Sequence, residues 1–117
     1  MKNAIQLTTI GEILYHLATK EIVVFNMLDG YGYFQQQGND ITIVIQPNVG
    51  SATIAIGNRS MLRKTFKQFY NTEFYVMPGL RADVKRITLL DRIADFFKKE
   101  WKDVFHSVFH KYDFATT

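Results

Sequence analysis

The sequence predicts one α+β domain over residues 1–117, with a small, mostly antiparallel sheet flanked by helices and a long C-terminal helix. Three observations support this fold class. With 47% hydrophobic and 15% aromatic residues among 117, the chain can fill one core but not two. Its middle alternates apolar and polar residues in short runs separated by turn residues, as strands do. Apolar residues at helical spacing flank that middle on both sides.

The first expected elements are a short helix and a hairpin. Residues 7–19 place apolar side chains three and four apart, and Thr8 or Thr9 can cap the helix. From residue 21 the pattern changes, because "EIVVFNML" is rich in β-branched residues and "YGYFQQQ" follows it. Asp29-Gly30, between the two runs, is a dipeptide that two-residue hairpin turns favour. We therefore expect a helix over 7–19 and a hairpin over 21–37.

Two more strands, a second helix and a fifth strand are expected next. "ITIVIQ" at 41–46 and "SATIAIG" at 51–57 alternate in the same way, so four strands form a meander. Asn58 can cap a helix in "NRSMLRKTFKQFYN", residues 58–71, whose apolar side is Leu62, Phe66 and Phe69. "EFYVM" at 73–77 is expected to be a strand that Pro78-Gly79 ends.

The last helix is expected over about residues 84–112, where apolar residues recur every three or four positions. A second apolar stripe widens this surface beyond the single face that packs on a sheet. A second copy of the chain is one candidate to cover it. We therefore expect a homodimer contact through Phe105, Phe109 and Tyr112.

The positive charge lies in the second half of the chain. Residues 1–58 hold two cations and four acids, whereas residues 59–117 hold twelve cations and seven acids, within a net charge of +3. Such asymmetry raises the probability of a polyanionic partner, although a row of cations is often only the solvated side of a helix. The stretch 58–71 is the clearest case, because it contains four cations and no acid.

These cations and nearby aromatic residues predict a surface that binds single-stranded RNA. Clustered cations neutralise phosphates and release counterions, and exposed aromatic rings stack on bases. The basic residues could converge if the strand at 73–77 returns the chain beside the helix before it. The expected nucleic-acid contacts are Arg59, Arg63, Lys64, Lys67, Arg81, Lys85 and Arg86, with Tyr31, Tyr33 and Tyr70 for the bases.

Other kinds of chemistry find little support in the sequence. The chain has no cysteine, so thiolate metal sites and cysteine nucleophiles are excluded. His106 and His110 are four apart but lack further ligands, and we expect no metal and no other cofactor. No nucleophile or phosphate-loop motif occurs, so we expect no enzyme. The N-terminus does not resemble a signal peptide and no apolar run approaches ~20 residues, so we expect a cytoplasmic protein without a membrane span.

The order of these elements resembles the PrgU-like family. The resemblance covers nearly the whole chain and runs through "NRSMLRKTFKQFY", "EFYVM" and "RITLLDRIADFFKKEW". It implies a compact β-barrel like the PUA domain, a fold used in RNA binding, and an origin in Gram-positive conjugative plasmids and related loci. It also implies a regulator that restrains production of a cell-surface adhesin, plausibly at the transcript level. It implies no catalytic residues.

A function of another class is the alternative. The aromatic C-terminal helix could instead make the chain a protein-interaction module or a homo-oligomeric structural module. The two functions use different surfaces, because the first needs the basic residues around 59–86 and the second needs the stripe around 105–112.

Overall fold

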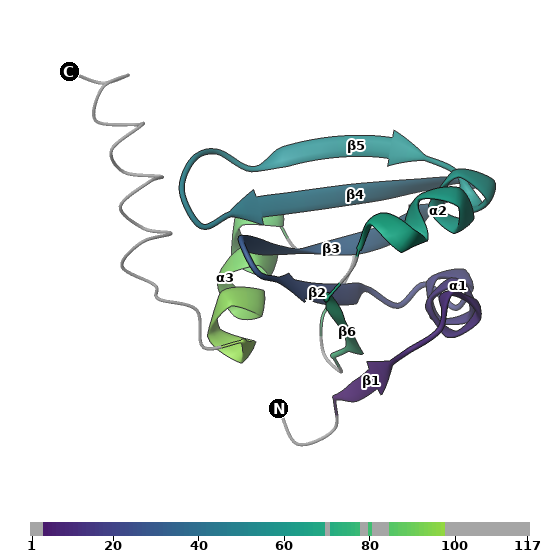
Figure 1. Cartoon of the computed structure of the whole chain (residues 1–117), viewed down its shortest axis with the longest axis horizontal. Coiled ribbons are helices and arrows are strands. Elements are labelled where there is room, and N and C mark those ends of the chain that lie inside the picture. Colours follow the sequence, from purple (N-terminus) through teal and green to yellow (C-terminus); the bar gives the residue numbers. More distant parts are fainter. Residues whose placement is uncertain (1–3, 70, 78–79, 81–84, 98–117) are drawn as a thin grey trace.

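A computed structural model describes residues 4–69, 71–77, 80 and 85–97. Its strands form one six-stranded antiparallel sheet in the order β1-β6-β2-β3-β4-β5, with helices on both faces (Figure 1). The α+β class is confirmed. The compact β-barrel that the family resemblance implies is not observed, because the sheet is open, with β1 and β5 at its two edges. The strands are β1 (Ile5–Leu7), β2 (Val23–Met27), β3 (Gly30–Gln37), β4 (Asp40–Pro47), β5 (Thr53–Gly57) and β6 (Glu73–Val76).

The predicted meander is confirmed as β2, β3, β4 and β5, each pairing with the next. The turn of the first hairpin differs from the prediction. Met27 pairs with Gly30, so the turn residues are Leu28 and Asp29, and Gly30 is the first residue of β3. Gly30 is needed for another reason, since a Cβ there would lie 2.6 Å from the carbonyl oxygen of Gln46.

The fifth predicted strand is confirmed as β6, and it lies between β1 and β2. Val76 is opposite Val23 of β2 on one side and opposite Ile5 of β1 on the other. Strand β1 was not predicted. Because Leu7 belongs to β1, the first helix, α1 (Ile10–Ala18), is shorter than the expected 7–19.

Helix α1 begins with a reciprocal cap. The Thr9 hydroxyl accepts a hydrogen bond from the Glu12 backbone N–H at 3.2 Å, and a Glu12 carboxylate oxygen accepts from the Thr9 N–H at 3.1 Å. The Thr8 backbone N–H also donates to this carboxylate, and these hydrogen bonds lower the pKa of Glu12. The cap satisfies backbone donors that a helix start leaves unpaired.

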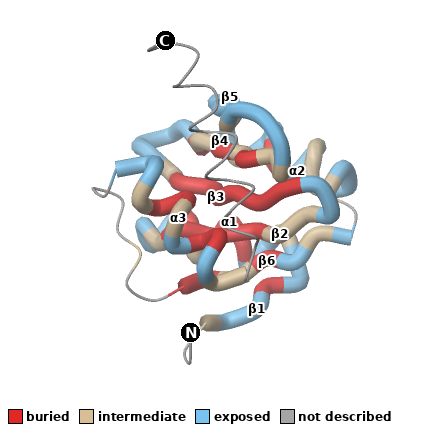
Figure 2. Tube along the Cα trace, turned by 90° about the vertical axis from the view of Figure 1, so that its left-hand side faces the viewer, coloured by how far each residue is buried: buried red, intermediate tan, exposed pale blue. Residues whose placement is uncertain are grey.

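The sheet separates two apolar clusters because strand side chains alternate between faces. Val23 and Phe25 of β2 belong to the first cluster, whereas Val24 belongs to the second. The first lies beneath α1 and beneath α2 (Arg59–Thr65) with the short 3-10 turn η1 (Phe66–Gln68). The second lies beneath α3 (Arg86–Phe96). The central strands β2 and β3 are thus buried on both faces over most of their length, while β5 is exposed (Figure 2).

The C-terminal helix is described only in part. Helix α3 confirms a helix within the expected range of about 84–112, and its buried residues are Leu89, Leu90, Ile93 and Ala94. The predicted dimer contact through Phe105, Phe109 and Tyr112 and the two histidines His106 and His110 lie outside the described residues. Among the helices that the structure describes, none is long and apolar enough to cross a bilayer.

Candidate nucleic-acid interface

Helix α2 follows β5 directly and is held in place at both ends. The Asn58 side-chain oxygen accepts a hydrogen bond from the Met61 N–H at 2.9 Å, which caps the first turn. Leu62 is buried, and Phe66 packs against the first apolar cluster. Just beyond η1, the ring of Phe69 meets the ring of Phe34 edge to face at 5.5 Å. The predicted apolar side of this segment is therefore the side that faces the core.

Three of the four predicted cations of this segment point to solvent. Arg63, Lys64 and Lys67 are exposed on the side of α2 and η1 that lies opposite the core contacts. Within the described part of the chain, none of the three forms an ion pair. Residues 41–72 contain no acid at all, so no carboxylate nearby in sequence reduces their positive potential. We call Arg63, Lys64 and Lys67 the α2 basic surface.

Arg59, the fourth cation, has a structural contact instead. Its guanidinium Nη1 donates to the backbone carbonyl of Leu14 in α1 at 3.0 Å and lies 3.3 Å from the side-chain oxygen of Gln36 in β3. Arg59 is half-buried and links α2 to α1 and to the sheet. Removing it would lower stability as well as charge, so it is a poor residue for testing phosphate contacts.

The second group of predicted cations lies on the other side of the sheet. Lys85 and Arg86 are exposed at the start of α3, which packs on the second apolar cluster, whereas α2 packs on the first (Figure 1). Arg81 lies outside the described residues. The structure therefore does not bring Lys85 and Arg86 together with Arg63, Lys64 and Lys67. The reason is that β6 pairs between β1 and β2, and the helix that follows it covers the opposite face of the sheet.

Two of the three predicted base-stacking residues are buried. Tyr31 and Tyr33 are 0% and 3% exposed, beneath α3, so neither ring presents a face to a base. Burial raises the pKa of Tyr33, while the nearby Arg86, which hydrogen-bonds the hydroxyl, lowers it in part. Tyr70 lies outside the described residues. Tyr31 and Tyr33 are buried because β3 is covered on both faces.

The hydroxyl of Tyr31 is a buried polar group that has no hydrogen-bond partner among the described residues. The side-chain oxygen of Asn26, which is opposite Tyr31 across the β2–β3 pair, likewise has none in that part of the chain. Burial, and next the negative charge of Asp91 on α3, raise the pKa of Tyr31, and burial raises the pKa of Asp91. We do not assign Tyr31, Asn26 and Asp91 to one binding site. They show that the α3 side of the sheet buries polar atoms at some cost in stability.

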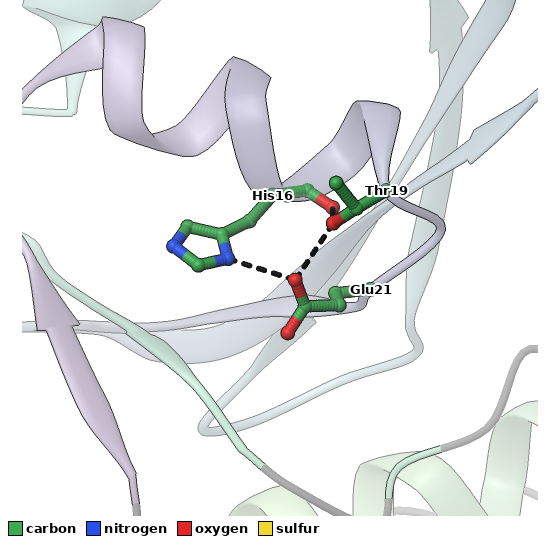
Figure 3. Close-up of polar contacts among 3 residues, drawn as sticks. All are labelled: His16, Thr19 and Glu21. Carbon is green, nitrogen blue, oxygen red and sulfur yellow. Dashed lines mark hydrogen bonds and ion pairs between the residues drawn. The ribbon is translucent and has the colours of Figure 1, made fainter.

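A compact polar cluster at the end of α1 was missed by sequence reasoning (Figure 3). His16 Nδ1 lies 2.9 Å from a carboxylate oxygen of Glu21, and the Thr19 hydroxyl donates to the same oxygen at 2.7 Å. Lys20, with φ of 70°, turns the chain so that Glu21 folds back onto the helix end. The hydrogen bonds from His16 and then Thr19 lower the pKa of Glu21.

The His16 cluster has limited chemical capacity. A carboxylate that orients an imidazole is one part of many catalytic and metal sites. In the described portion of the chain, however, no group of three or more His, Cys, Asp or Glu side chains could hold a metal ion. The cluster is therefore best explained as a set of hydrogen bonds that stabilises the connection between α1 and β2.

Comparisons of the chain with protein-family models, with curated proteins and with solved structures gave no match.

Proposed function

We propose that this chain is a non-enzymatic regulatory domain that binds single-stranded RNA through the α2 basic surface. The observation that carries the proposal is the exposure of Arg63, Lys64 and Lys67 on a helix whose other side is fixed in the core. Cations that neutralise phosphates drive nucleic-acid binding, and a carboxylate paired with such a cation would weaken its attraction for phosphate. Within the described residues, none of these three side chains is paired with a carboxylate.

The proposed surface is smaller than the sequence suggested. It keeps Arg63, Lys64 and Lys67 and leaves out Arg59, whose guanidinium is engaged, and the α3 cations, which face away. Without Tyr31 and Tyr33 as stacking platforms, contacts to phosphate rather than to bases should dominate. Binding should therefore depend strongly on salt and weakly on sequence. Restraint of a surface adhesin at the transcript level, as in the PrgU-like family, is the regulatory role that we propose for such binding.

The test is the affinity of the full chain for single-stranded RNA oligonucleotides, measured by fluorescence anisotropy at several salt concentrations. In the double variant Arg63→Ala/Lys67→Ala we expect weaker binding to every sequence. The salt slope should become shallower by about 1.4, since each phosphate contact on a single strand contributes ~0.7. Thermal stability should change little because both side chains are exposed.

The matched control is Lys85→Ala/Arg92→Ala, which removes the same net charge from exposed positions at the start of α3 and within it. We expect this control to leave the affinity and the salt slope near those of the parent. Equal losses in both double variants would show that net charge alone drives binding. An unchanged affinity in Arg63→Ala/Lys67→Ala, or no binding by the parent at low salt, would overturn the proposal.

A further inference from the structure

Strand β5 is an exposed edge of the sheet. Among the described strands it pairs only with β4, so its other side carries backbone N–H and C=O groups without a strand partner. Its side chains are exposed on both faces from Thr53 to Ile56. Ile54 is 46% exposed and Ile56 is 68% exposed. An apolar edge of this kind is a template for pairing with another strand.

The features that normally protect an edge strand are absent from β5. Proteins discourage edge pairing with charged side chains, prolines, bulges or very short strands. The sequence from residue 41 to residue 58 contains no charged residue, and β5 contains no proline. Its register with β4 is continuous from Thr53 opposite Ile45 to Gly57 opposite Ile41. The opposite edge, β1, is only three residues long.

We propose that β5 is the interface of a homodimer, in which the β5 strands of two copies pair antiparallel about a two-fold axis midway between their Ala55 residues. Residues that face each other across an antiparallel pair lie on the same face of the sheet. A two-fold axis perpendicular to the sheet must therefore lie midway between the two copies of one residue, which face each other. With the axis at Ala55, Ile54 faces Ile56 of the partner copy and Thr53 faces Gly57 of the partner copy, which matches all five residues of β5.

A second copy of the chain can pair with this edge because the edge carries no charged residue. In self-pairing about a two-fold axis, any charged residue at the centre would face its own like charge at short range. Residues 41–58, which include all of β5, carry no charge, so no repulsion arises between the paired residues. The two symmetric Ile54–Ile56 contacts would bury the apolar surface that β5 now exposes. Because the contact is isologous, it closes after two copies.

The expected dimer is weak. Five strand residues extend over roughly 17 Å, so the contact buries less than the roughly 1,200 Å² that marks the lower end of stable interfaces. A dissociation constant in the micromolar range or above is therefore expected. This interface is distinct from the predicted stripe Phe105, Phe109 and Tyr112, which lies outside the described residues.

A charge-swap experiment on the full chain tests the pairing. Ala55→Lys places two lysines opposite each other across the axis, and Ala55→Glu does the same with two carboxylates. Sedimentation equilibrium from micromolar to millimolar concentration should show that each variant alone dissociates about tenfold more readily than the parent, since a few ångströms separate the like charges. An equimolar mixture of the two variants should recover parent-like association or exceed it.

A matched control places the same charge on the other edge. Gln6→Lys changes an exposed residue of β1 and should leave association unchanged. Circular dichroism melting of all variants checks that the fold is intact. A parent that stays monomeric at millimolar concentration would overturn the proposal. So would a dimer that is insensitive to both Ala55 substitutions, or an assembly that grows beyond two copies.

Discussion

Strands β3 and β5 lie two places apart in one sheet, and neither contains a charged residue. β3 is buried from Gly30 to Gln35, with helices over both of its faces, whereas β5 is exposed from Thr53 to Ile56. An uncharged alternating pattern therefore identifies a strand in both cases. It does not say how many neighbours that strand has. The side chains of β3 pack in the core and stabilise the fold, whereas the side chains of β5 are exposed and can contact another chain.

The largest effect is expected from a matched pair of glycine substitutions. In Gly32→Ala of β3, the new Cβ would lie 1.9 Å from the carbonyl oxygen of Val44 and 2.7 Å from the ring of Phe25. Backbone must shift, so we expect a loss of about 3 kcal/mol or more in unfolding free energy, or no folded protein. In Gly57→Ala of β5, the Cβ would meet only the flexible Met61 side chain, at 3.5 Å. Urea unfolding should show a change within about 0.5 kcal/mol for Gly57→Ala.

Equal losses in the two glycine variants would break the contrast between β3 and β5. A loss below about 1 kcal/mol for Gly32→Ala would mean that β3 and β4 separate easily and that the centre of the sheet is looser than its burial indicates.

A smaller effect should distinguish two tyrosines of β3. Tyr31→Phe removes a buried hydroxyl that has no hydrogen-bond partner within the described part of the chain, so the unfolding free energy should stay the same or rise by up to about 1 kcal/mol. Tyr33→Phe removes a hydroxyl that interacts with Arg86. This substitution should lower the unfolding free energy by about 1 kcal/mol. Thermal unfolding of the two variants beside the parent checks the order. The reverse order would show that Tyr31 has a partner in solution, such as an ordered water.

The smallest effect concerns Glu21, which lies outside both strands. Its pKa in the folded chain is below the ordinary value of 4.5, so its contribution to stability is present above that value and is lost as pH falls through the folded pKa. Because the side chain is 42% exposed, Glu21→Gln should cost less than about 1 kcal/mol at pH 7. Unfolding at a series of pH values should show the difference from the parent shrinking below about pH 4. A difference that grows in acid would contradict the assigned hydrogen bonds.

Local patterns predicted most of the elements. Alternation identified β2 to β5, and helical spacing with the Asn58 cap identified α2. Strand β1 was missed because three residues show no periodicity and its partner β6 lies far along the chain. The turn position was misassigned because Asp29-Gly30 favours a hairpin turn, while Gly30 is in fact required by the approach of Gln46.

The candidate site was predicted less well than the fold. The α2 cations were placed on the exposed side of their helix because Leu62 and its apolar neighbours define the other side. Whether Lys85 and Arg86 join them depends on which face α3 covers, and that follows from the non-local pairing of β6. The tyrosines of β3 were assigned to an open face because alternation alone cannot show that a strand is covered twice.

The position of β6 between β1 and β2 also governs the order in which the sheet can be completed. Strands β2 to β5 can pair as soon as they follow one another from the ribosome, but the second edge of β2 has no partner until Glu73–Val76 has been made. Until then Val23, Val24 and Phe25, which are fully buried in the finished fold, lie on an open edge. An unpaired apolar edge is where nascent chains associate wrongly. Synthesis beyond residue 76 is therefore the point at which this chain can first shield the buried residues of β2 on both sides.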